Sequence, residues 1–144
     1  MGLIADFVVA TPQDAIRYES LLQEGKAVPP ERYARAEYKN FTPLALGMLW
    51  AILSHEAWNG ERHQFHDISH TGNGKTWLLR FPDEFVTLLA TFDAASDDQI
   101  AAAWIATGEV RGTHDNLKSV LRDLKHLAIR TRDGGRYLYL WGSL

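Results

Sequence analysis

The chain has 144 residues, a length typical of one domain, and 46% of them are apolar, as in ordinary globular proteins. It contains no cysteine, which excludes disulfides, thiolate metal sites and cysteine nucleophiles. The amino-terminal segment lacks the basic region of a signal peptide, and no uncharged apolar stretch is long enough for a membrane span. These features predict a cytoplasmic protein with one domain over residues 1–144.

The amino-terminal residues predict a strand followed by a helix. Residues 3–10 are rich in β-branched, aliphatic and aromatic side chains, as in a strand that is buried on at least one face. Thr11 and Pro12 combine an N-cap residue with a proline at the first helical position. We expect this helix to end at Gly25, a natural C-terminal stop.

A polar segment then leads to a second helix. Residues 26–41 are expected to form a connector that packs along the surface. Thr42 and Pro43 repeat the helix-opening pattern, and the residues after them are apolar on all sides. They predict a central core helix that runs to about Trp58.

The middle of the chain predicts a β-hairpin. Asn-Gly at 73–74 is a strong signal for a two-residue turn between antiparallel strands. With this turn, Asp67 faces Arg80 as a cross-strand ion pair, and His70 faces Trp77.

Three histidines, His63, His66 and His70, have a spacing that would place them on one face of a helix, where they could bind a metal ion. On a strand, His63 points away from the other two, which lie about 13 Å apart at roughly 3.3 Å per residue. Two histidines at that separation cannot share an ion, so we expect no metal ion and no other cofactor. The alternative is a metal-binding protein or small hydrolase that uses the three histidines, with Asp67 or His55.

The predicted hairpin places His66 and His70 on its apolar face, beside Phe81 and Trp77. Two environments fit that position. Both histidines could be core residues with hydrogen-bond partners, which we expect, or they could edge a pocket.

Other catalytic motifs are incomplete. The Gly-Lys-Thr at 74–76 resembles the end of a phosphate-binding loop, but Ser69 occupies the place of the required earlier glycine. His55 and Glu56 resemble part of a zinc-protease motif, but Asn59 stands where the second histidine is needed. We therefore expect no catalytic residues.

The second half predicts three helices and a closing strand. Residues 82–92 form an amphipathic pattern, and Ser96 with Gln99 has the spacing of a capping box. Thr113 begins the most clearly amphipathic helix, and residues 137–141 predict a strand inside a sheet because both faces are apolar. The apolar positions of the last helix are Leu117, Val120, Leu121, Leu124, Leu127 and Ala128.

The last helix also carries a basic face. Residues 111–136 have a net charge of +4 in a protein whose net charge is −3. We identify a candidate interaction surface on this helix: Lys118, Arg122, Lys125 and His126. Nucleic-acid binding by these cations together with Arg130 is an alternative, but a pI of about 6.0 is not typical of that function.

The two ends of the chain support a resemblance. Met1 and Gly2 before a short strand, the helix at 85–92 and the closing sequence YLYLWGSL resemble a family of small bacterial domains of unknown function. The resemblance implies a bacterial α+β protein and provides no activity.

Together, the elements predict an α+β domain with about five helices and a sheet of about four strands. These strands are the amino-terminal strand, the hairpin and the carboxy-terminal strand, mainly antiparallel, although the terminal pair could run parallel. Small size, acidic charge, abundant aromatic residues and incomplete catalytic motifs favour a non-catalytic protein-interaction module. Its partner would be another protein, as for an inhibitor or immunity protein.

Overall fold

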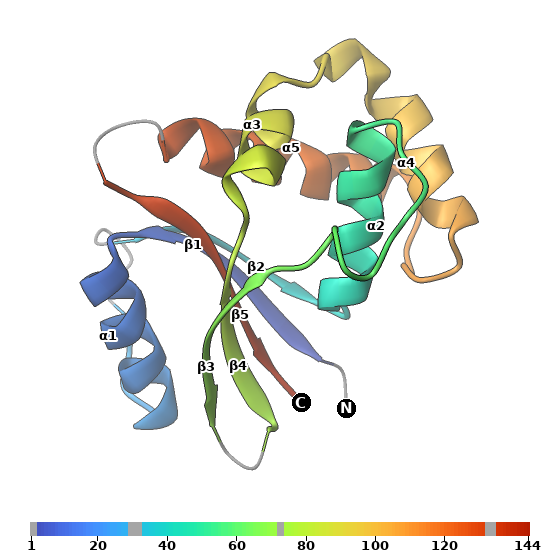
Figure 1. Ribbon diagram of the computed structural model, residues 1–144. Coiled ribbons are helices and arrows are strands. Elements are labelled where there is room, and N and C mark those ends of the chain that lie inside the picture. The colour runs from blue at the N-terminus through green and yellow to red at the C-terminus, as the bar shows by residue number, and fades with distance from the viewer. Residues whose placement is uncertain (1–2, 29–32, 72–73, 132–134) are drawn as a thin grey trace.

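A computed structural model describes residues 3–28, 33–71, 74–131 and 135–144, which form an α+β structure around one antiparallel sheet (Figure 1). The strands are β1 (Ile4–Ala10), β2 (Ala34–Lys39), β3 (His66–Thr71), β4 (Thr76–Arg80) and β5 (Tyr137–Ser143). The helices are α1 (Pro12–Gln23), α2 (Pro43–Leu53), α3 (Asp83–Thr91), α4 (Asp97–Ala106) and α5 (His114–Arg130), with a short 3-10 helix at Ala94–Ser96. The α+β fold class is therefore confirmed.

The sheet has the strand order β2-β1-β5-β4-β3 and separates two apolar cores. Helix α1 lies on one side of the sheet, whereas α2, α3, α4 and α5 gather on the other (Figure 1). Phe7 and Val9 of β1 enter the larger core with the four helices, and Val8 and Ala10 enter the smaller core with α1. Alternate side chains of one strand thus serve two cores, which explains why residues 3–10 are apolar on both faces.

The terminal strands are neighbours inside the sheet, where β1 pairs with β5 along its whole length. Their pairing is antiparallel, so a parallel arrangement of this pair is excluded. Since every other pair in the sheet is antiparallel as well, the chain needs no parallel crossover connection.

The surface connector predicted for residues 26–41 is wrong in part, because it contains β2. This edge strand pairs with β1 and raises the number of described strands to five. Ala34, Ala36 and Tyr38 pack against the larger core, whereas Arg35 lies on the opposite face with the other charged side chains of β2. Short alanines and frequent charges conceal this alternation in the sequence.

The predicted hairpin is formed by β3 and β4, but its register differs from the expectation. His70 does face Trp77. Asp67, however, lies opposite Leu79 and not opposite Arg80, since a β-bulge between positions 67 and 69 inserts Ile68 as an extra residue. The expected Asp67–Arg80 pair is therefore wrong. Residue 73 of the predicted turn lies outside the described part of the chain.

Three helix starts follow the predicted N-caps, whose hydroxyls accept a backbone hydrogen bond: Thr11, Thr42 and Thr113. Ser96 precedes α4 but makes no capping bond through its side chain, so the predicted capping box is wrong. Helix α2 ends at Leu53, earlier than the expected Trp58. The chain leaves the helix there because His55 adopts a positive φ of 56°. No helix of the described residues is long and apolar enough to cross a membrane.

Candidate interaction site

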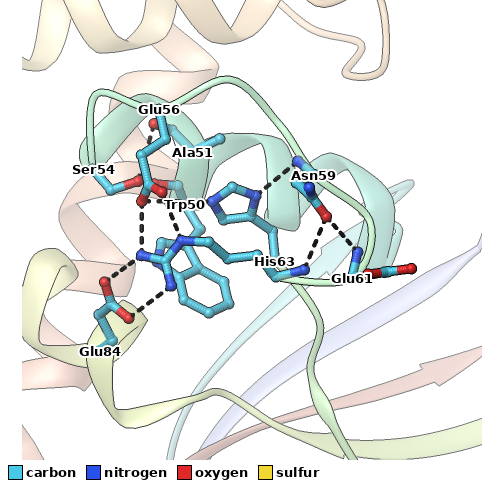
Figure 2. Close-up of polar contacts among 9 residues, drawn as sticks. Trp50, Ala51, Ser54, Glu56, Asn59, Glu61, His63 and Glu84 are labelled. Carbon is cyan, nitrogen blue, oxygen red and sulfur yellow. Dashed lines mark hydrogen bonds and ion pairs between the residues drawn. The ribbon is translucent and has the colours of Figure 1, made fainter.

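The loop between α2 and β3 folds back onto α2 and is anchored by His63. The side chain of His63 is fully buried, and its ring meets Trp50 edge-on at a centroid distance of 5.0 Å. Its Nδ1 accepts a hydrogen bond of 3.0 Å from the backbone N–H of Asn59, while its own backbone N–H donates to the Asn59 carbonyl at 2.9 Å. Figure 2 shows His63 enclosed between Trp50 and the Asn59 turn. His63 is therefore a structural residue of this loop.

Gly47 of α2 makes this close packing possible. A Cβ at position 47 would lie 2.8 Å from the carbonyl oxygen of His63 and 3.4 Å from Nε1 of Trp58. A glycine inside a helix costs about 1 kcal/mol relative to alanine. Because Gly47 has no side chain, the loop backbone lies directly on α2. The indole of Trp58 lies beside the same position of the helix.

Arg62 fastens the same loop to the start of α3. Its guanidinium contacts both Glu56 oxygens at 2.7 Å and both Glu84 oxygens at 2.6 and 3.3 Å. It also lies 5.5 Å from the ring centre of Trp50. Arg62 holds the pKa of Glu56 well below its usual range, at about 2. We name Glu56, Arg62 and Glu84 the surface triad, which has a net charge of −1.

Next to this loop is an open cavity of about 380 Å³ with mainly apolar walls. Trp58 and Leu44 line it and stay 45% and 38% exposed. Phe65 and Leu79 contribute apolar surface from the sheet side. Large apolar side chains that remain exposed side by side are typical of interaction surfaces.

The surroundings of the cavity are acidic. Asp67 lines the cavity and is largely exposed, and the exposed Glu61 directly follows the cavity residue Gly60. The surface triad adds one further net negative charge through the same loop. His70 is the near partner of Asp67, with Nε2 at 2.8 Å from its carboxylate. The cavity thus combines an exposed indole with the carboxylate of Asp67, and the adjoining loop carries further carboxylates.

The structure does not bring the three histidines together. His63 is buried in the loop, and His66 and His70 are exposed on β3. His66 pairs with Arg80 and His70 with Trp77, so the β-bulge places the two on opposite faces of the sheet. The expectation that both are core residues is therefore wrong, because the bulge and the edge position of β3 expose them. Within the described ranges, no group of three His, Cys, Asp or Glu side chains could hold a metal ion.

The basic side chains of α5 bind other parts of the protein. Lys118 and Arg122 form ion pairs of 2.9 and 3.3 Å with the acidic first turn of α4. Lys125 donates to two carbonyls at the end of α3, at 3.2 and 2.5 Å. His126 is exposed and lines a separate cavity. This candidate surface therefore contributes to helix packing, and three of its four members are engaged within the chain.

Comparisons of the chain with protein families, curated proteins and solved structures found no match. The resemblance to small bacterial domains stays a prediction. Sequence reasoning missed Trp58 as a site residue, because it placed this residue at the end of a buried helix. The signal was present, since a tryptophan before Asn-Gly lies in turn chemistry and not in a helix interior.

Proposed function

We propose that this protein is a non-catalytic interaction module that binds a basic segment of a partner protein at the Trp58 cavity. The observation that carries the proposal is the exposed Trp58 indole in a mainly apolar cavity that Asp67 also lines. Tryptophan is enriched among the residues that dominate binding energy, and its ring attracts a Lys or Arg cation. The inhibitor or immunity-type role expected from the sequence is compatible with such a surface.

The surface triad supports the choice of a basic partner. There, two carboxylates and the face of Trp50 hold the guanidinium of Arg62. Trp58 offers a second tryptophan face, with Asp67 at the same cavity. The same chemistry would therefore hold an arginine or lysine side chain of a partner.

The position of the cavity supports an extended partner segment. Asp67 belongs to β3, which is an edge strand of the described sheet and pairs there with β4 alone. An extended chain can add to such an edge through its backbone while alternate side chains enter neighbouring pockets. A partner strand beside β3 would thus direct one basic side chain toward Trp58.

A display selection of random peptides on the purified protein tests this proposal. We expect the selected peptides to share one Arg or Lys within an extended apolar context. Trp58→Ala should abolish this enrichment, whereas Ile16→Ala should retain it. Ile16 is a similarly exposed apolar side chain on α1, across the sheet from the cavity. Peptides without a basic residue, or equal enrichment by Trp58→Ala, would contradict the proposal.

Charge reversal tests the acidic border separately. Asp67→Lys should weaken binding of a selected basic peptide by about tenfold or more, because attraction between Asp67 and the basic side chain of the peptide is replaced by repulsion. Glu24→Lys makes the same change of formal charge at the end of α1 and should leave binding within about twofold at physiological salt. Equal effects of the two substitutions would show that only the overall charge matters.

A further inference from the structure

A second cavity, of about 320 Å³, lies on the α1 side of the sheet. Its walls come from α1, from the residues that follow it and from three adjacent strands, β2, β1 and β5. Its apolar wall consists of Ile4, Leu22 and Val28, and its polar wall includes Asp6, Arg35 and Trp141. The cavity at Trp58 has no residue in common with it.

Asp6 places a carboxyl group in the middle of β1, where it is only 4% exposed. Its Oδ2 accepts a hydrogen bond of 2.6 Å from the hydroxyl of Tyr18, and this hydroxyl accepts one of 2.9 Å from Arg35. We name Asp6, Tyr18 and Arg35 the buried cluster. A carboxylate can accept several hydrogen bonds, so one donor from Tyr18 leaves acceptor capacity at the cavity.

Trp141 adds an unused donor to the same face. It lies directly opposite Asp6 across the β1–β5 pair, so the two side chains project on the same side of the sheet. Trp141 is only 7% exposed, and its Nε1 is buried without a hydrogen-bond partner among the described residues. Buried polar groups are normally satisfied. Asp6 and Trp141 are thus neighbours on one face of the sheet, and both line the cavity.

The charges favour a cation over an anion. The guanidinium of Arg35 contacts Glu37 at 2.9 Å, so its positive charge is already balanced by a carboxylate. Lys26, at the border, contacts Glu24 at 2.9 Å. Among the described residues no cation contacts the carboxylate of Asp6 directly, and Arg35 reaches it only through the hydroxyl of Tyr18.

We propose that this cavity binds a small primary amine that carries a neighbouring oxygen acceptor and a short aliphatic body, as in an aliphatic amino alcohol. The ammonium group donates to the carboxylate of Asp6, and the oxygen accepts from Nε1 of Trp141. The aliphatic body contacts the apolar wall formed by Ile4, Leu22 and Val28. This inference is independent of the proposed function, since it concerns the other face of the sheet.

Titration with L-leucinol, followed by the indole N–H signals of the ¹⁵N-labelled protein, tests the proposal. The signal of Trp141 is identified by its loss in Trp141→Phe. We expect this signal to shift and to saturate, and Asp6→Asn to weaken binding about tenfold because it removes the charge and keeps the shape. N-acetyl-leucinol, which has no ammonium group, should not bind. Glu24→Gln, which removes an exposed carboxylate nearby, should leave the affinity within about twofold.

Three results would overturn the proposal: an unmoved Trp141 signal, equal affinity of Asp6→Asn, or equal binding of N-acetyl-leucinol. The comparison of L-leucinol with N-acetyl-leucinol uses the wild-type chain, so it tests the proposal even if Asp6→Asn folds poorly. A shift of the Trp58 signal alone would place the amine in the other cavity. The binding proposals for the two cavities can therefore be confirmed or contradicted independently.

Discussion

The surface triad and the buried cluster lie on opposite faces of one sheet and are built from the same kinds of side chain. The pKa values of their carboxyl groups nevertheless shift in opposite directions. Each contains an arginine and at least one carboxyl group. In the surface triad, Arg62 contacts its carboxylates directly and lowers the pKa of Glu56 to about 2. In the buried cluster, burial raises the pKa of Asp6, although Tyr18 donates to it. Desolvation outweighs the hydrogen bond there, so location decides the direction of the shift.

The difference between an exposed and a buried location also determines how much each cluster contributes to the stability of the fold. Exposed ion pairs contribute little because water screens them and because long side chains lose entropy when they are held. A buried polar group that loses its partner is costly, since nothing replaces the hydrogen bond. We therefore expect the buried cluster to stabilise the fold and the surface triad mainly to orient the loop beside Trp58.

The largest effect is expected for Tyr18→Phe. Tyr18 is fully buried, and loss of its hydroxyl removes the donor to Asp6 and the acceptor for Arg35. The free energy of unfolding should fall by about 1–3 kcal/mol, measured by urea denaturation. Tyr137→Phe is the matched control, because Tyr137 is only half-buried. Equal losses in the two variants would contradict a special role for the buried cluster.

A smaller loss of unfolding free energy is expected for Gly47→Ala, which disturbs the contact between α2 and the loop that carries Glu56 and Arg62. The new methyl group would lie 2.8 Å from the carbonyl oxygen of His63, a backbone atom that must move. Overpacking costs about 1–3 kcal/mol, of which about 1 kcal/mol is recovered from the higher helix propensity of alanine. Thermal and urea denaturation would measure the net loss. A more stable Gly47→Ala variant would show that the loop does not depend on close contact with α2.

The dependence of stability on pH should have opposite signs for the two carboxyl groups. The pKa of Asp6 is raised in the folded state, so its contribution is fully present below about pH 4 and is lost as the pH rises. The pKa of Glu56 is lowered to about 2, so its contribution is present above about pH 4 and is lost as the pH falls toward 2.

Urea denaturation at several pH values would test these signs with two isosteric variants. The stability of wild type relative to Asp6→Asn should decrease as the pH rises above about 4. Its stability relative to Glu56→Gln should decrease as the pH falls below about 4. Slopes of the same sign for the two comparisons would refute the distinction between the clusters.

The smallest effect is expected for Glu84→Gln. Glu84 is an exposed partner of Arg62, which keeps its two contacts to Glu56. The midpoint of urea denaturation should stay within experimental error of wild type, as for most exposed ion pairs. A loss as large as that of Tyr18→Phe would mean that the surface triad stabilises the fold.

The sequence predicts those parts of the fold in which local patterns and tertiary packing agree. All six apolar positions predicted for α5 are buried, and the terminal strands lie inside the sheet. These elements have regular apolar periodicity, which tertiary packing preserves. Strand β2 was missed because its core-facing side consists of two alanines and Tyr38, between charged residues.

The candidate site depends on contacts that no local pattern contains. One extra residue at Ile68 changes the register of β3 and separates His66 from His70, and such bulges have no reliable local signal. The burial of His63 requires Gly47, which lies sixteen positions earlier in the chain. Trp58 becomes a surface residue only because α2 ends at Leu53 and the loop folds back.

The central claim is that the Trp58 cavity binds a basic segment, and an NMR titration tests it most directly. An arginine-containing peptide from the display selection would be added to ¹⁵N-labelled protein, with the five indole N–H signals observed. We predict a saturable shift of the Trp58 signal, absent for the same peptide with glutamine in place of arginine. A peptide that binds while the Trp58 signal stays unmoved, or a glutamine peptide that binds equally well, would contradict the claim.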